Sequence, residues 1–350
     1  MTKQPAIKRF GVLVGASPKV KRVYNAIAKA AKISVPVLLV GETGTGKELV
    51  AQEIHARSPR RDHPFVAVNM GAVSSELVAS ELFGHVKGAF TGAVDNRVGC
   101  YEEAQQGTLF LDEITTMEER VQVALLRVIE SGTFRPIGAK QDKKADVRLI
   151  AATNVDLRDA VHSGIFREDL LHRFQVLRIK LPPLREHPSD IPMLAYHFLD
   201  QFRKEFEFKI DLIEEDALQL MQNYRWPGNS RELKNVIAQA AVMAEEGSIR
   251  AEHLPYRIRR PQGAEVVSEA EEDLEGPELI HQSSSEPSEG SLNNQNGLFV
   301  PVGLSLENVQ KSYVLKTLEH CSQNKTLAAN MLGVSRKALY DKLQRWGVSI

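Results

Sequence analysis

Short apolar runs alternate with helical patterns through residues 11–185. Four of these runs, at 36–40, 65–68, 108–111 and 147–152, have the composition of buried strands. β-branched and aliphatic runs set between helices are typical of parallel strands that are covered on both faces. The pattern therefore predicts an α/β core in which a parallel sheet lies between layers of helices.

The residues on either side of this core differ from it in pattern. Residues 1–10 predict a short N-terminal tail. Residues 186–260 carry helical periodicity, clearest at 216–224 and 230–244, and no convincing strand, so we expect a small all-helical subdomain there. Residues 262–300 contain nine acidic residues and no Lys or Arg. Such a composition buries too little apolar surface to fold alone, which predicts a disordered linker over residues 261–300.

Helical pattern returns over residues 301–350. Residues 326–332 predict a short helix, Gly333 and Val334 a turn, and Ser335 the N-cap of a second helix that runs to Trp346. This order is typical of a helix-turn-helix, whose second helix enters the major groove of DNA. The candidate DNA contacts are the N-cap and the polar residues that the apolar stripe leaves facing outward: Ser335, Arg336, Lys337, Tyr340 and Gln344.

The charge of this C-terminal segment supports DNA as the partner. Seven Lys and Arg residues stand against three acidic residues over 301–350, a net charge of +4 that the acidic linker hides in the whole-chain total of −1. Basic residues neutralise the phosphates of double-stranded DNA. A helical bundle for dimerisation, with Leu306, Val309 and Tyr313 on its face, is the alternative, and the two roles are compatible.

Composition excludes several other classes of protein. Apolar residues make up 43% of the chain and charged residues 25%, which are ordinary values for a soluble globular protein. No stretch approaches the roughly 20 apolar residues of a membrane span. Cys100 and Cys321 form no CxxC pair, and the ten histidines form no cluster with metal-ligand spacing. We therefore expect a cytoplasmic protein with no membrane partner and no metal site beyond a nucleotide-bound magnesium ion.

A glycine-rich loop follows the first predicted strand and precedes a helical pattern at 48–57. Glycines let successive backbone N–H groups turn toward a phosphate, and the positive end of the following helix adds to the attraction. A lysine that ends the loop reaches the β- and γ-phosphates. Glu48 stands where this motif usually has a Ser or Thr that ligates magnesium, which leaves that contact open. The candidate nucleotide-binding residues are Gly41, Glu42, Thr43, Gly44, Thr45, Gly46, Lys47 and Glu48.

An acidic pair, Asp112 and Glu113, follows the predicted strand at 108–111. A carboxylate at a strand end beside a phosphate loop can hold magnesium, and a second can activate the attacking water as a general base. We therefore predict that Asp112 holds Mg²⁺ and that Glu113 is the catalytic base of ATP hydrolysis.

A third motif combines an aromatic and a hydroxyl residue with small residues. Its members are Gly88, Ala89, Phe90, Thr91, Gly92 and Ala93. An exposed Phe90 on a flexible loop is costly unless it meets a partner, and the alternative is a loop that packs on the core. With the phosphate loop and the acidic pair, this hexapeptide resembles the signature of the sigma-54-dependent activators, or bacterial enhancer-binding proteins, within the AAA+ ATPases. In that family the hexapeptide contacts sigma-54, and most members end in a Fis-type DNA-binding domain.

The resemblance covers residues 11–255 and 304–350 and implies roles for five further residues. Asn154 matches the sensor of the γ-phosphate, and Arg231 matches the second sensor on the helical lid. Asn69 matches the residue that can hydrogen-bond Glu113 and hold it idle. Arg167 and Arg173 match the arginines that act on a neighbouring subunit's ATP, although Glu168 and Asp169 offer them ordinary local ion pairs.

An arginine supplied by a neighbour implies a closed homo-oligomeric ring, and the family suggests a hexamer. The resemblance therefore implies an ATPase that remodels sigma-54 RNA polymerase holoenzyme at promoters. The alternatives are a DNA-binding regulator in which ATP only controls oligomerisation, and an AAA+ unfoldase or helicase loader. Because about ten residues precede the motor, no receiver domain is expected. Regulation then comes from a protein in trans or from expression level, or the chain is a fragment.

Overall fold

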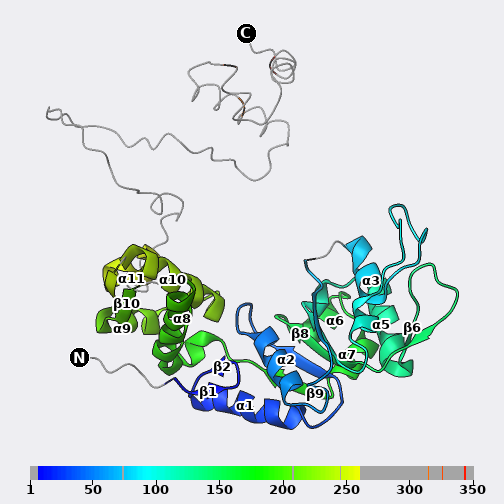
Figure 1. Ribbon diagram of the computed structural model, residues 1–350, viewed down its shortest axis with the longest axis horizontal. Coiled ribbons are helices and arrows are strands. Elements are labelled where there is room, and N and C mark those ends of the chain that lie inside the picture. The colour runs from blue at the N-terminus through cyan, green and yellow to red at the C-terminus, as the bar shows by residue number, and fades with distance from the viewer. Residues whose placement is uncertain are drawn as a thin grey trace. The chain divides into compact units, whose positions relative to one another are not determined.

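The computed structural model describes residues 7–72, 75–206, 209–244 and 246–260, together with Val314, Lys325 and Leu343 (Figure 1). The expected linker at 261–300 lies outside these residues. So does the expected helix-turn-helix, apart from those three positions, with its candidate DNA contacts Ser335, Arg336, Lys337, Tyr340 and Gln344. None of the described helices is long and apolar enough to cross a membrane.

A five-stranded parallel sheet forms the centre of the core. Its strands, in spatial order, are β4 (Phe65–Asn69), β5 (Thr108–Asp112), β8 (Arg148–Thr153), β3 (Val37–Val40) and β9 (Leu177–Lys180). The four expected strands are confirmed to within one residue at either end. The sequence did not reveal β9, because this edge strand alternates in burial and only Ile179 on it is buried.

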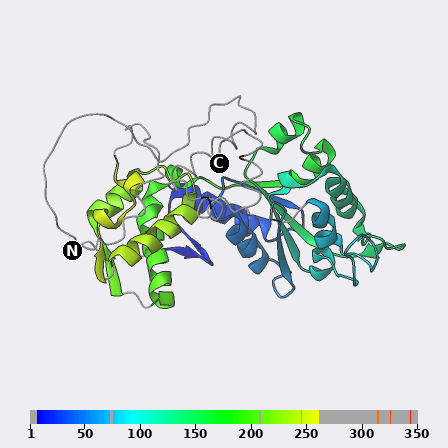
Figure 2. The ribbon, with the colours of Figure 1, turned by 90° about the horizontal axis from the view of Figure 1, so that it is seen from above.

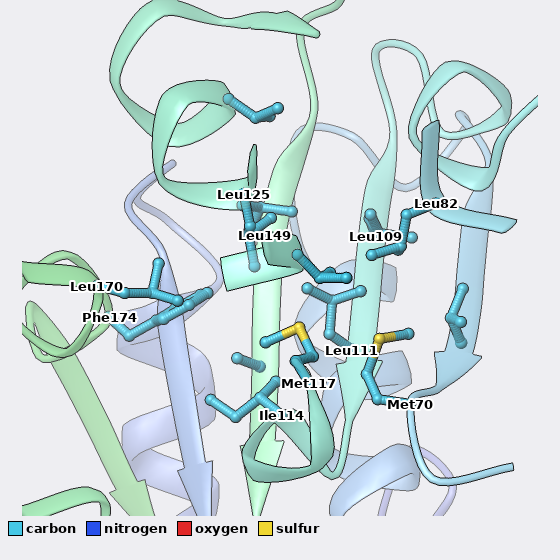
Figure 3. Packing of buried hydrophobic residues seen from close by; sticks show 14 of the residues in the cluster. Met70, Leu82, Leu109, Leu111, Ile114, Met117, Leu125, Leu149, Leu170 and Phe174 are labelled. Atoms are coloured by element: carbon cyan, nitrogen blue, oxygen red, sulfur yellow. The ribbon is translucent and has the colours of Figure 1, made fainter. Parts of the chain in front are cut away.

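Helices cover both faces of this sheet. α1 (Pro18–Ala30) and α2 (Lys47–Ala56) pack on one face, where Ile27 and Ile54 belong to the same buried cluster as Phe110 of β5. The other face is covered by α3 (Ser75–Phe83), α4 (Cys100–Glu103), α5 (Glu119–Ser131), α6 (Leu157–His162) and α7 (Glu168–Phe174). Figure 3 shows Leu125 of α5 beside Leu149 of β8 in this second layer. Successive residues of a strand point to opposite faces, so one continuous apolar run supplies both layers.

A second body, residues 184–260, packs around the fully buried Trp226. It contains α8 (Ile191–Phe206), α9 (Glu215–Asn223), α10 (Asn229–Ala244) and α11 (Tyr256–Arg259), with three short 3₁₀ turns, η2 (Leu184–Glu186), η3 (Pro188–Asp190) and η4 (Ala251–His253). The expectation that this body has no strand is wrong. β10 (Lys209–Ile213) pairs in parallel with β11 (Glu246–Ile249) and buries Ile210, Ile213 and Ile249. Each strand is too short to show a period that distinguishes it from the flanking helices.

Two small hairpins complete the described fold. β1 (Arg9–Phe10) pairs with β2 (Leu13–Val14), so the expected N-terminal tail ends in a strand. Phe10 stacks on Tyr24 of α1, and the Arg57 guanidinium lies 3.8 Å from the centre of the Phe10 ring. β2 contacts both α2 and α8, and this hairpin appears in blue between the two groups of helices in Figure 2. The other hairpin pairs β6 (Thr133–Phe134) with β7 (Lys143–Lys144).

Candidate functional site

The glycine-rich loop joins β3 to α2 as expected. Gly44 and Gly46 have φ of 79° and 86°, which are left-handed values that L side chains rarely adopt. A Cβ on Gly44 would also lie 2.2 Å from the carbonyl oxygen of Gly228. Thr45 Oγ1 donates to the Glu42 carbonyl at 2.7 Å. The loop therefore needs glycine at position 44 for two reasons, its backbone conformation and the close approach of residue 228.

Lys47 begins α2 and is only 8% exposed. Its Nζ donates to the carbonyl oxygens of Gly41 at 2.9 Å and Glu42 at 3.2 Å. Burial lowers the pKa of Lys47 below its usual value, and the nearby carboxylates of Asp112 and Glu113 act in the opposite direction. A buried ammonium group held by neutral carbonyls favours an anion, so this cradle fits a phosphate.

Glu48, the departure from the usual motif, lies on the exposed side of α2. Its side chain accepts a hydrogen bond from Gln52 Nε2 at 3.4 Å, one helical turn away. A carboxylate in this position contributes charge to the helix start without occupying the loop.

The acidic pair lies at the carboxyl end of β5, next to the end of β4. Asn69 and Asp112 are paired residues of the two strands, and Asp112 Oδ1 accepts from the backbone N–H of Glu113 at 2.9 Å. Glu113 has φ 57° and ψ 46°, a conformation that is uncommon for a residue with a side chain and that turns the chain into η1 (Ile114–Thr116). The sheet thus brings the two carboxylates to the same edge as Lys47.

Gly71 lies between the side chains of Asn69 and Glu113. A Cβ on Gly71 would lie 2.3 Å from Glu113 Oε2 and 3.4 Å from Asn69 Oδ1. The Asn69 side chain accepts a hydrogen bond from the Gly71 N–H at 2.8 Å. The structure therefore places Asn69 and Glu113 on either side of Gly71, with the Asn69 oxygen engaged by the Gly71 N–H.

Residues from β8 and from the second body close around the loop. Asn154 follows β8, and its Nδ2 lies 3.4 Å from Thr43 Oγ1. Arg231 lies in the first turn of α10, and its Cβ would be 3.1 Å from a Cβ built on Gly44. Both candidate sensors are therefore next to the glycine-rich loop.

Sequence reasoning missed Asn229, which binds the loop more directly than Arg231 does. Asn229 is fully buried with φ 51°. Its Nδ2 donates to the Thr43 carbonyl at 3.0 Å and to Glu42 Oε2 at 3.2 Å, and its Oδ1 accepts from the Leu184 N–H at 2.8 Å. The Gly228-Asn229 pair after Pro227 was a turn signal, because Asn tolerates left-handed backbone, but nothing in the pattern indicated the distant partners.

Sequence reasoning also missed a partly open pocket beside Thr45. Apolar side chains supply most of its wall, and a few polar groups lie at its rim. An apolar lining with a few polar groups is typical of a small-molecule pocket, and aliphatic side chains can pack against the face of a nucleobase. Its lining residues are Leu13, Val14, Val20, Val23, Tyr24, Thr45, Val50, Leu181, Pro182, Leu184, His187, Leu194, Asn229 and Ser230.

A buried carboxylate fastens one wall of this pocket. Asp190 Oδ1 accepts from the backbone N–H groups of Ala16 at 2.8 Å and Ser17 at 2.9 Å, and Oδ2 lies 3.1 Å from His187 Nδ1. Burial alone would raise the pKa of Asp190, but these hydrogen bonds outweigh it and lower the pKa to about 2. The start of α1 is therefore tied to η3.

Arg167 and Arg173 lie beside α5, in the helical layer on the sheet face opposite to α2. Arg167 is the N-cap of α7 and forms ion pairs with Asp169 at 2.8 Å and Glu119 at 3.0 Å. Arg173 pairs with Glu130 at 2.7 Å. Both guanidinium groups are partly exposed, so each is available to an approaching partner at the cost of a surface ion pair worth under about 1 kcal/mol.

The hexapeptide forms the end of a loop between α3 and α4. Residue 88 donates its N–H to the Ala93 carbonyl at 2.9 Å, and residue 93 donates to the Phe90 carbonyl at 3.0 Å. Gly88 and Gly92 have φ of 80° and 104°, which explains the glycines. The expectation of a freely exposed Phe90 is wrong. The ring is half-buried and lies edge-on to His85 with 5.0 Å between ring centres, because His85 supplies an aromatic surface at the base of the loop.

Three family profiles match the chain. The Sigma-54 interaction domain matches residues 13–180, the AAA+ ATPase lid domain matches 185–271, and Bacterial regulatory protein, Fis family, matches 305–346. The expected fold class is thereby confirmed: an α/β AAA+ core with a parallel sheet, a lid subdomain and a separate Fis-type helix-turn-helix.

Relatives match along almost the whole chain. XylR of Pseudomonas putida is 39% identical over 340 residues, which are 96% of this chain and 57% of that protein. NtrC of Azospirillum brasilense is 38% identical over 97% of this chain and 70% of that protein. AtoC of Escherichia coli K12 is 42% identical over 97% of this chain and 68% of that protein. The chain thus spans little more than half of XylR and about two thirds of the others.

Solved structures agree with this result. NtrX of Brucella abortus in complex with ATP has a TM-score of 0.66 and 30% identity, covering 97% of this chain and 70% of that one. The ADP complex of the same protein gives the same TM-score and identity over 96% and 69%. With the family profiles and the curated relatives, these matches establish that the chain belongs to the sigma-54-dependent transcriptional activators and that its motor is an AAA+ ATPase.

Proposed function

We propose that this chain hydrolyses ATP in a homo-oligomeric ring and uses the hydrolysis to open promoters held by sigma-54 RNA polymerase. The observation that carries the proposal is the buried Lys47 ammonium group at the glycine-rich loop, at the same sheet edge as Asp112 and Glu113. Phosphoryl transfer to water requires a cation that binds the phosphates, a carboxylate that binds the metal ion and a general base.

ATP is the nucleotide that the site fits. The glycine-rich loop and Lys47 would hold the phosphates. The adjoining pocket would hold the adenine nucleobase against aliphatic side chains such as Val20 and Leu194. NtrX, which shares the fold, has been solved with ATP and with ADP. The contacts of Asn154 and Asn229 with Thr43 support a role for the sensors and the lid in responding to the phosphates.

We assign the hydrolytic roles by position. Asp112 would hold Mg²⁺, which when bound neutralises charge on the phosphates, and Glu113 would orient and deprotonate the attacking water. Asn69 would restrain Glu113 across Gly71. Arg167 and Arg173, which are partly exposed beside α5, would reach the ATP of the next subunit in a ring, a hexamer by family resemblance.

Two further partners complete the proposal. The loop at 88–93 would contact sigma-54, with Thr91 exposed at its tip and Phe90 able to leave His85. The Fis-family segment at 305–346 would bind double-stranded DNA upstream of the promoter. We place the protein with these partners in the cytoplasm, with a regulatory protein acting in trans as one route of control.

Promoter opening by purified sigma-54 polymerase tests this function. Open complexes should form with this protein and ATP, and should not form without nucleotide or with Glu113→Gln protein, which keeps the phosphate loop. Opening by Glu113→Gln protein with ATP would instead favour a regulator in which ATP only controls oligomerisation.

A further inference from the structure

Gln122 forms a buried bracket between two segments of the core. This side chain on α5 is 1% exposed. Its Nε2 donates to the carbonyl oxygens of Met117 and Ile165, each at 2.9 Å, and its Oε1 accepts from the backbone N–H of Arg167 at 2.9 Å. Both amide hydrogens are used. The opposite orientation of the amide would place its NH₂ group against the Arg167 N–H, so only one orientation satisfies all three partners.

The two segments that Gln122 connects would contribute to different active sites, one in the same subunit and one in the neighbouring subunit. Met117 ends the turn η1 that Glu113 begins, and its side chain is packed in the core. Ile165 and Arg167 lie directly before α7, where Arg167 is the N-cap. The hydrogen bonds of Gln122 therefore fix the position of the segment before α7, which carries Arg167, relative to the turn that follows Glu113.

The Arg167 side chain does not fix this position. Its guanidinium pairs with Glu119 and Asp169 at the surface, where such pairs are weak and exchange readily. The backbone N–H of Arg167, in contrast, is held by a buried amide. The guanidinium group can thus reorient toward a new anion while the backbone of Arg167 stays in place.

We infer that Gln122 is a positioning residue for Arg167, which sets where the arginine is presented to the neighbouring subunit's ATP. The inference rests on the proposed function, since it requires Arg167 to act in trans. A misplacement of about 1 Å in such a group can cost about 10²-fold in rate. Gln122 should therefore affect turnover in the adjacent site and leave nucleotide binding in its own site unchanged.

The test uses full-length Gln122→Leu protein, which loses all three hydrogen bonds at similar volume. Alone, it should bind ATP with wild-type affinity and assemble, with kcat reduced about 10²-fold and KM unchanged. Val128→Ala, a core deletion six residues further along the same helix, is the control for general loss of stability and should keep kcat within a few-fold. If Gln122→Leu does not assemble, Gln122→Met, which has a similar volume and also lacks all three hydrogen bonds, replaces it.

Mixed rings distinguish a positioning role from a structural one. Glu113→Ala subunits carry a correctly placed Arg167, so mixing them with Gln122→Leu subunits should restore hydrolysis. Arg167→Ala subunits supply no arginine, so mixing them with Gln122→Leu should restore none. Restoration by Arg167→Ala, or no restoration by either, would overturn the inference. If mixing Glu113→Ala with Arg167→Ala subunits restores no hydrolysis, the proposal of active sites shared between subunits fails, and this inference fails with it. If that mixture restores hydrolysis but the mixture of Glu113→Ala with Gln122→Leu does not, only this inference fails.

Discussion

Asn229 Nδ2 lies 3.0 Å from the carbonyl oxygen of Thr43, so the first residue of α10 is hydrogen-bonded to the loop that would hold the phosphates. The same side chain accepts from the Leu184 N–H at the start of the second body. One buried amide therefore links the loop, the lid helix and the segment that enters the lid. Movement of the phosphates and movement of the lid should be coupled through it.

Removal of the Asn229 side chain tests this link. Asn229→Gly keeps the left-handed backbone at φ 51° and deletes the amide. Two hydrogen bonds to the loop region are worth about 0.5–1.5 kcal/mol each, so ATP affinity should fall by about 10-fold. A fluorescent ATP analogue measures the affinity. Wild-type affinity in a variant that melts normally would show that the lid and the loop are independent.

Asp190 gives a pH-dependent prediction. Its pKa is about 2 in the folded protein against 3.8 in the unfolded chain, so it stabilises the fold above pH 4, and this contribution is lost as the pH falls toward 2. The shift corresponds to about 2 kcal/mol at pH 7, of which about half remains at pH 3. Denaturant unfolding of wild type and Asp190→Asn should therefore differ more at pH 7 than at pH 3. An equal difference at both pH values would contradict the assignment.

Arg167 should be essential for hydrolysis and act only within the assembly. Arg167→Ala should lower the rate about 10³-fold, by analogy with other arginine fingers. Mixing it with Glu113→Ala protein should recover activity, since some sites then receive both groups. Arg120→Ala, another surface arginine on the same side of the core, is the matched control. Rates that do not depend on protein concentration would argue against a shared site.

The C-terminal segment should bind DNA independently of the motor. A truncation after residue 260 should keep ATPase activity and lose specific DNA binding. The isolated 301–350 segment should bind a duplex with an affinity that falls steeply with salt, because phosphate neutralisation releases counterions. Gel-shift titrations at two salt concentrations measure this. Absence of binding at low salt would remove the DNA-binding role from this segment.

Local motifs made much of the core predictable from sequence. The strands that contain Leu38, Leu109 and Ile150 are buried on both faces, so their apolar runs are continuous and easily recognised. Lys47 and Asp112 belong to short motifs directly after such strands. In these cases the chemistry and the element that positions it are adjacent in the sequence.

Residues whose role depends on distant partners could not be predicted in this way. Asn229 contacts Thr43 across 186 positions, and Asp190 contacts Ala16 across 174. Gln122 had the pattern of an ordinary polar position on an amphipathic helix, although it is buried and holds three backbone groups. The half-buried Phe90 was misjudged for the same reason, since His85 becomes its partner only when the loop folds back.

In the proposed mechanism, the hexapeptide loop at residues 88–93 couples ATP hydrolysis to sigma-54. Thr91 lies at an exposed position on the loop, and the substitution Thr91→Ala should leave the phosphate site intact. One lost contact costs about 1 kcal/mol, but the loss is repeated in every subunit of a ring. Asp95→Ala, an exposed change in the same loop outside the hexapeptide, is the control.

The most direct measurement pairs phosphate release with open-complex formation, on one preparation of Thr91→Ala protein with sigma-54 polymerase. We expect near-normal phosphate release and loss of promoter opening from Thr91→Ala, with both activities retained in Asp95→Ala. A parallel fall of both activities in Thr91→Ala would mean that the residue supports the motor's structure. Normal opening by Thr91→Ala would contradict the claim that this loop transmits the work of hydrolysis to sigma-54.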